Sequence, residues 1–213
     1  MLSDEELPLP KHSIAYKAYF SSLNNEVKRI YAVAEAARAK GYDPELKVEI
    51  PPAHDVAARV EATLEGPVGV AKRIRELQET MSREEVAFAI AREIAEGSLG
   101  RIEDKEKAAD KAVRVALAIL TESITAAPLE GISKVRIRGS GASEYLALYL
   151  AGPIRAAGGT EAAVTVLVAD YVRQVLGLPA LVPTDDEVER ALEEVELYAR
   201  NVHLQYPIHP ELL

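Results

Sequence analysis

Residues 105–126 read KEKAADKAVRVALAILTESITA, and this stretch decides the fold. Its apolar side chains fall on two sides of a helix instead of one; they are Val113, Val115, Leu117, Ile119, Leu120 and Ile124. A helix that is apolar nearly all round is buried by other elements of the protein. We therefore expect residues 105–126 to form the central buried helix, which Pro128 ends.

Helical patterns continue on both sides of this segment. Apolar periodicity and helix start and stop signals predict further helices over residues 13–40, 55–64, 68–81, 82–97, 161–176 and 184–203. Two of these helices have the spacing of a capping box at their start: Ser82 is followed by Glu85, and Thr184 is followed by Glu187. The sequence therefore predicts a protein built mainly from helices.

Two strand-like runs, residues 134–138 and 145–150, follow the central helix. The six residues between them contain two glycines, which indicates an antiparallel β-hairpin. Apolar and charged residues also alternate over residues 46–50, where we expect a short strand. The predicted fold class is α+β and predominantly α-helical, a helical bundle with a small antiparallel β-hairpin.

We divide the chain into four parts. Residues 1–12 are expected to be a flexible lead-in, and residues 13–127 a helical region. Residues 128–206 would hold the hairpin, a Gly-rich loop and two C-terminal helices packed on the hairpin. Residues 207–213 are expected to be the beginning of a linker that is cut short.

The composition excludes several classes of protein. Of the 213 residues, 48% are hydrophobic and 28% are charged, a balance that excludes a disordered or membrane-embedded chain. Cysteine is absent, which excludes a disulfide framework, a thiolate metal site and a cysteine nucleophile, and favours an intracellular protein. The acidic start does not resemble a signal peptide, and no apolar stretch approaches the ~20 residues that span a bilayer, so we expect no membrane association.

Charge is unevenly distributed along the chain. The formal net charge of −9 does not favour a general nucleic-acid-binding protein. However, residues 128–160 carry a net charge of +2, whereas residues 184–213 carry −6. A modestly basic hairpin and loop are therefore expected beside an acidic terminal helix.

The sequence offers little for catalysis by a metal or a nucleophile. None of the four histidines has the spacing of a zinc site. The nucleophile motif Gly-x-Ser-x-Gly is also absent. We therefore predict no metal site and no catalytic residue in this chain.

The Gly-rich loop, Ala151–Thr160, is the first candidate anion site. Glycines before a helix present free backbone N–H groups and the positive end of the helix dipole, and Arg155 adds a cation. Arg155, Gly158, Gly159 and Thr160 are the candidate ligands. The alternative is a tight strand-to-helix turn in which Thr160 is simply the N-cap.

The basic strand is the second candidate. Side chains alternate in a strand, so Lys134, Arg136 and Arg138 share one face and could follow a nucleic-acid backbone. No aromatic row is evident beside them, and the alternative is the solvated face of an edge strand, kept charged to prevent pairing with other strands. The sequence leaves both interpretations open.

Several segments in order along the chain resemble one family. They are Lys40–Pro44, Val48–Pro51, Ala58–Glu61, Gly69–Ala71, Arg73–Leu77, Ala126–Ile132, Ser143–Ala147, Ala151–Thr160, Val168–Arg173 and Leu204–Tyr206. In these segments the chain is similar to the N-terminal region of the large subunit of archaeal family-D DNA polymerase. One departure is Ala156, where the family usually has serine, which puts a hydroxyl contact to phosphate in doubt.

The resemblance implies a part of a replicative enzyme. It implies that the catalytic aspartates and their Mg²⁺ lie further along a much longer subunit, so this chain alone would be inactive and would hold no cofactor. The partners it implies are a small subunit with 3′–5′ exonuclease activity, a sliding clamp bound through the full-length chain, and DNA, contacted weakly or indirectly here. The expected location is the cytoplasm, in association with the nucleoid. Two alternatives remain open, a stand-alone phosphate- or nucleotide-binding enzyme and a purely structural protein–protein module.

Overall fold

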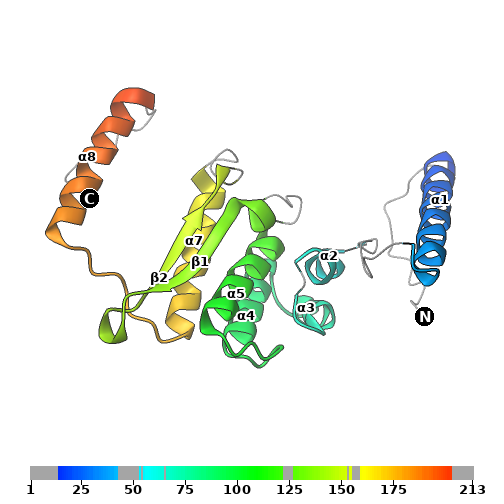
Figure 1. Cartoon of the computed structure of the whole chain (residues 1–213), viewed down its shortest axis with the longest axis horizontal. Helices are drawn as coiled ribbons and strands as arrows, with labels where there is room; N and C mark the ends of the chain where they lie inside the picture. The colour runs from blue at the N-terminus through cyan, green and yellow to red at the C-terminus, as the bar shows by residue number, and fades with distance from the viewer. Residues whose placement is uncertain are drawn as a thin grey trace. The chain divides into compact units, whose positions relative to one another are not determined.

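A computed structural model describes residues 14–42, 53, 55–64, 66–121, 127–152, 154 and 159–202. The chain divides into two compact units, Met1–Thr80 and Met81–Leu213, each of which is described by itself. The elements of both units are labelled in Figure 1. The predicted strand at residues 46–50, the lead-in and residues 203–213 lie outside the described residues.

The first unit contains three described helices, α1 (Ile14–Ala39), α2 (Val56–Thr63) and α3 (Val70–Gln78). Helix α1 buries none of its residues. Helices α2 and α3 pack against each other, and their buried side chains include Val60 and Ile74. Asp55 fixes the start of α2, because its carboxylate accepts the backbone N–H of Ala58 at 2.6 Å and pairs with Arg75 of α3 at 2.7 Å.

The second unit is built around α5 (Lys105–Leu120), which packs against α4 (Arg83–Ala95), α7 (Gly159–Val175) and the first strand of the hairpin. Nine residues of α5 are buried, and five of them are alanines. Small side chains allow close approach of neighbouring helices. This confirms the prediction of a central buried helix; residues 122–126 of the predicted segment lie outside the described residues.

The hairpin consists of β1 (Ile132–Arg138) and β2 (Tyr145–Leu150), which pair in antiparallel register. Its inward face contacts α5 through β1 and α7 through β2, as Figure 1 shows. Strand β1 begins two residues earlier than predicted. An irregularity in the pairing between Ile132 and Lys134 turns Ile132 inward, on the same side as Val135. Ile132 is consequently 2% exposed and belongs to the core.

A π-helical turn, Ala127–Gly131, joins the central helix region to β1. Arg114 of α5 fixes this connection: its guanidinium donates to the carbonyls of Pro128 and Leu129, both at 3.0 Å, and of Ile132 at 2.8 Å. The same guanidinium pairs with Asp110 at 2.8 Å. One arginine therefore connects the buried helix to the beginning of the hairpin.

The last described helix, α8 (Asp185–Val202), is acidic in its first turn, and none of its residues between positions 185 and 201 is buried. Its capping box is present, since Thr184 and Glu187 exchange hydrogen bonds, and so is that of Ser82 and Glu85 on α4. Both capping predictions are confirmed. The predicted fold class is confirmed as well, a predominantly helical α+β fold with a two-stranded antiparallel sheet. Among the described residues, no helix is both long and apolar enough to cross a membrane.

Candidate nucleic-acid interface

The outward face of the hairpin gathers cations and aromatic rings. The strand register places Lys134 opposite Tyr149, Arg136 opposite Ala147 and Arg138 opposite Tyr145. Residues directly opposite each other in an antiparallel pair share one face of the sheet. Three basic residues, two tyrosines and one alanine therefore share this face, which we call the outward face.

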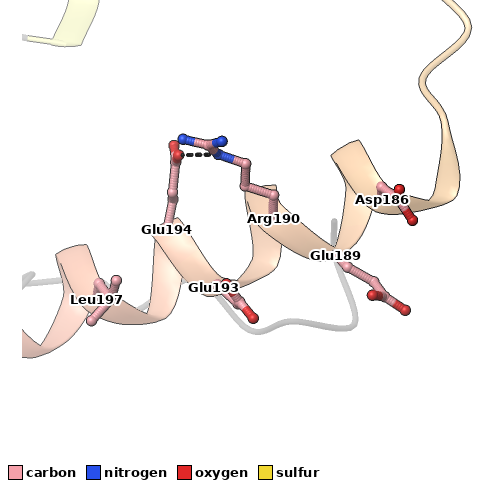
Figure 2. Close-up of a pocket in the computed structure, with 6 residues that line it drawn as sticks. All are labelled: Asp186, Glu189, Arg190, Glu193, Glu194 and Leu197. Carbon is pink, nitrogen blue, oxygen red and sulfur yellow. Dashed lines mark hydrogen bonds and ion pairs between the residues drawn. The ribbon is translucent and has the colours of Figure 1, made fainter.

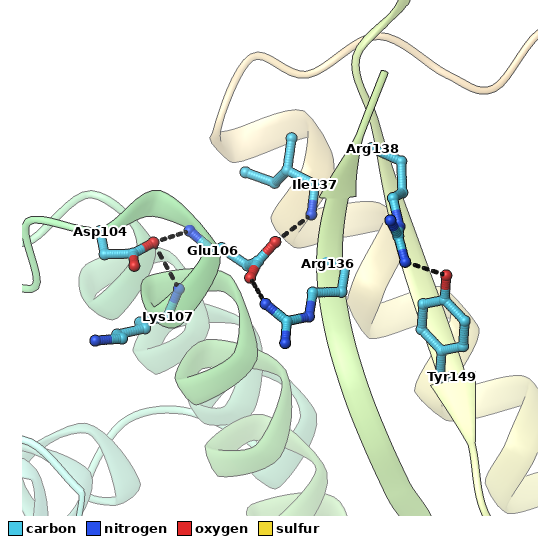
Figure 3. A network of polar contacts seen from close by, with 7 residues as sticks. All are labelled: Asp104, Glu106, Lys107, Arg136, Ile137, Arg138 and Tyr149. Atoms are coloured by element: carbon cyan, nitrogen blue, oxygen red, sulfur yellow. Dashed lines mark hydrogen bonds and ion pairs between the residues drawn. The ribbon is translucent and has the colours of Figure 1, made fainter. Parts of the chain in front are cut away.

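The side chains of the three cations differ in their interaction partners. Glu106, on the first turn of α5, lies at the edge of β1, where its Oε2 accepts the backbone N–H of Ile137 at 2.9 Å and its Oε1 pairs with the guanidinium of Arg136 (Figure 3). The bond from Ile137 and the pairing with Arg136 lower the pKa of Glu106. Glu106 thus satisfies an edge N–H that has no strand partner, and it draws Arg136 toward the edge of the sheet.

The position of Glu106 is fixed by the start of its helix. Asp104 is the N-cap of α5, and its Oδ1 accepts the backbone N–H of Glu106 at 2.9 Å and of Lys107 at 3.3 Å. Figure 3 shows Glu106 beside β1 and Asp104 on the side of Glu106 that faces away from the strand. Negative charge is favoured at a helix N-terminus, so the residues that begin α5 also fix its contact with the hairpin.

Arg138 lies along the outward face toward Tyr149. Its Nη2 donates to the Tyr149 hydroxyl at 3.2 Å, and its Cζ is 6.0 Å from the centre of the Tyr149 ring (Figure 3). The hydroxyl bond raises the pKa of Arg138, which stays charged in any case. The two side chains reach toward each other across the position of Ala147.

Lys134 is exposed at the other end of the face. It forms no ion pair with the residues that the structure describes. Two of the three predicted cations, Lys134 and Arg138, are therefore presented on the outward face, while the third is paired with an acid.

The aromatic residues were missed when the sequence was considered alone. Tyr145 and Tyr149 lie on β2, whereas the cations lie on β1, so the rings are not close to the cations in sequence. The interpretation that no aromatic row lies beside the cations was therefore wrong. The signal that could have found them is the period of two in both strands, combined with the register that the connection imposes.

The Gly-rich loop is described at residues 151, 152, 154, 159 and 160. Arg155 and Gly158 lie outside the described residues, whereas Gly159 and Thr160 are exposed in the first turn of α7. Thr160 lies within this helix instead of preceding it as an N-cap. Within the described part of the chain, no hydrogen bond connects Gly159 or Thr160 to the cations of β1.

Glu161 bears on the anion hypothesis for this loop. It follows Thr160 in the same turn, and its Oε2 is shielded from solvent without a hydrogen-bond partner among the described residues. A carboxylate in the first turn of a helix interacts with the same positive dipole end that a phosphate would use. The described part of the loop therefore gives less support to an anion site than the outward face of the hairpin does.

A surface hollow lies along α8, and the described residues that line it all belong to that helix (Figure 2). The lining residues are Asp186, Glu189, Arg190, Glu193, Glu194 and Leu197. Arg190 is paired with Glu194 at 3.0 Å, and the carboxylates of Asp186, Glu189 and Glu193 project from the helix away from this pair in Figure 2. Such an acidic surface repels phosphate, so it does not extend the basic face.

No group of three His, Cys, Asp or Glu side chains in the described ranges is arranged to hold a metal ion. We assign no catalytic step to them.

Comparison with known proteins finds one family and relatives that share one name. Residues 18–212 match the family described as "DNA polymerase II large subunit DP2, N-terminal". The chain is 54% identical over 204 residues to the DNA polymerase II large subunit of Thermococcus kodakarensis, covering 94% of this chain and 11% of that relative. It is 54% identical over 200 residues to the protein of the same name from Methanosphaera stadtmanae, covering 91% of this chain and 18% of the relative.

A third relative, the DNA polymerase II large subunit of Pyrococcus horikoshii, is 52% identical over 209 residues, covering 96% of this chain and 14% of the relative. The chain thus spans between 11% and 18% of the length of these relatives. The similarity extends over both units of the structure.

Proposed function

Because the chain belongs to the family of N-terminal regions of the DNA polymerase II large subunit, we propose that it is a scaffold and interaction domain of an archaeal replicative DNA polymerase. The match over residues 18–212 is the observation that carries this proposal. DNA-directed DNA synthesis would belong to the full-length subunit, with its Mg²⁺ held by carboxylates further along that chain. The domain itself would supply surfaces and no chemistry.

The proposed partners follow from the same family membership. They are the small subunit with its 3′–5′ exonuclease activity, DNA contacted weakly by this domain, and a sliding clamp contacted by the rest of the large subunit. An assembly of this kind would work in the cytoplasm, on the nucleoid.

Exposed apolar side chains support an interaction role. On α1 the exposed residues include Phe20, Leu23 and Ile30, and on α8 they include Val188 and Leu197. Contiguous apolar surface on a soluble domain is typical of protein–protein contact sites. Both helices bury no residue against their own unit among the residues described, so both remain available to a partner.

Assembly of the full-length subunit tests this proposal. The large subunit, with and without this domain, would be co-expressed with the tagged small subunit, and the copurified amount and primer extension would be measured. We expect the deletion to reduce copurification and extension together. Equal copurification and equal extension without the domain would overturn the proposal.

A point variant avoids the risk that a deletion unfolds the rest of the subunit. Phe20→Ser combined with Leu23→Ser changes only exposed side chains of α1, so the domain should stay folded. The matched control is Lys28→Ser, also exposed on α1. We expect the apolar double variant to lower copurification of the small subunit and the control to leave it unchanged.

A further inference from the structure

We infer that the outward face of the β1–β2 hairpin is a binding site for single-stranded DNA, in which Tyr145 and Tyr149 stack on bases while Lys134 and Arg138 contact phosphates. The inference rests on the proposed function, because the polymerase assembly is what brings single-stranded DNA to this domain. To that function it adds single-stranded DNA as the ligand of this face, and a role for each of the four side chains.

The charge on the outward face is complementary to a phosphate backbone. Every ionisable side chain that the register places on this face, apart from the two tyrosines, is basic. Glu106, a described acid that contacts a cation of this face, is placed at the edge of β1 and pairs with Arg136. Lys134 and Arg138 therefore offer two positive charges to an anionic chain lying along the hairpin. This face is positive although the formal net charge of the whole protein is −9.

Neither tyrosine is buried in the core: Tyr149 is exposed and Tyr145 is half-buried. Tyr149 is 40% exposed, whereas the alternate residues of the hairpin, such as Val135, are turned toward the helices. Tyr145 and Tyr149 are separated by four residues of an extended strand, about 13 Å, so they would contact different bases.

The contact between Arg138 and Tyr149 orders the site before any ligand binds. The hydroxyl bond restrains both long side chains on the surface of the sheet. Restraining a side chain in its bound position lowers the entropic cost of binding. The guanidinium then lies next to the ring on which a base would stack, where one nucleotide can reach both.

Stacking on these tyrosines requires bases with free faces. In a duplex each base face is covered by its neighbours, whereas single strands expose them to aromatic side chains. Cations alone would bind both forms, because both carry phosphates. Selectivity for single strands is therefore the property that separates a stacking site from a basic patch.

Fluorescence anisotropy of the 213-residue chain with a labelled thymidine oligonucleotide, and with a duplex of equal length, tests the inference. We expect tighter binding of the single strand, and a plot of log affinity against log salt with a slope of about −1.4, as two phosphate contacts give. Tyr149→Ala should weaken binding about fivefold to a hundredfold through the lost stacking. Tyr149→Phe keeps the ring and loses only the hydroxyl bond to Arg138, so it should weaken binding less than Tyr149→Ala does.

Tyr198→Ala is the matched control, because Tyr198 is an exposed tyrosine on α8 at 54% exposure and lies outside the hairpin. It should bind DNA as the natural protein does. Equal affinity for duplex and single strand, or unchanged binding by Tyr149→Ala, would overturn the inference. Neither result would affect copurification with the small subunit, which tests the proposed function separately.

Discussion

Glu106 accepts the backbone N–H of Ile137 at 2.9 Å, and through this contact the first turn of the buried helix holds the edge of the hairpin. Its second oxygen pairs with Arg136. An edge strand normally exposes unpaired N–H groups to solvent or to another strand. Here a side chain of α5 satisfies one of them, so the position of the helix and the charge on the hairpin depend on the same carboxylate.

Replacing Glu106 by glutamine should make the protein less stable at neutral pH. The pKa of Glu106 is lowered in the folded state, so its ionised form favours folding above the unfolded pKa, and this contribution is lost as pH falls through the folded pKa. We expect the melting temperatures of Glu106→Gln and the natural protein to differ at about pH 7 and to converge toward about pH 3. Glu103→Gln, an exposed neighbour, should melt like the natural protein throughout.

The same substitution should strengthen binding of single-stranded DNA. Without the carboxylate, Arg136 becomes available as a third cation beside Lys134 and Arg138. One added phosphate contact corresponds to about a fivefold gain at about 0.1 M salt, and to a steeper salt dependence. Anisotropy titrations of both proteins over a range of salt concentrations would measure this gain, and weaker binding by Glu106→Gln would contradict it.

Arg114→Ala should destabilise the second unit strongly. Its side chain is 17% exposed and donates to three backbone carbonyls, which would lose their partner in a partly buried location. We expect a loss of about 3 kcal/mol in the free energy of unfolding, measured by urea denaturation. Arg190→Ala breaks an exposed pair on α8 and should cost about 0.5 kcal/mol or less.

Gly139→Ala should disrupt the connection between the two strands. Gly139 has a φ of 84°, and a Cβ there would lie 2.1 Å from the carbonyl oxygen of Ser143. Because both the backbone conformation and the space are unsuitable for alanine, we expect a cost of about 3 kcal/mol in urea denaturation. Gly141 also has a positive φ, but no atom lies within 4 Å of its Cβ position, so Gly141→Ala should cost only about 1 kcal/mol.

The two capping boxes provide a matched pair of substitutions. Ser82→Ala removes the cap of α4, whose buried face belongs to the core, and should lower the free energy of unfolding by about 1 kcal/mol. Thr184→Ala removes the same motif from α8, which buries none of its described residues. This second change should lower helicity in the circular dichroism spectrum without shifting the main unfolding transition, and equal shifts for both variants would contradict the distinction.

Local patterns were sufficient to predict most of the helices. The period of the apolar residues located α5 and its burial, and short-range hydrogen bonds determined the starts of α4 and α8. These features depend on residues within a few positions of each other, which is why they can be derived without tertiary contacts. The two strands and their antiparallel connection follow from the same local signals.

The candidate site required the tertiary structure. The sequence showed three cations with a period of two, but the tyrosines that face them belong to the other strand, and the register of the pairing decides which rings meet which charges. The sequence also gave no indication that Arg136 is paired with a residue 30 positions earlier.

The sequence by itself was therefore sufficient to predict the helices, the hairpin and the family. Periodicity, capping and the similarity of ordered segments depend on residues that are close in sequence. Only the tertiary structure decided the composition of the outward face. Packing of α5 against β1 places Glu106 at the edge, and strand pairing brings Tyr149 to Arg138. Contacts between residues distant in sequence are fixed by burial of the shared core, and their partners cannot be derived from local preference.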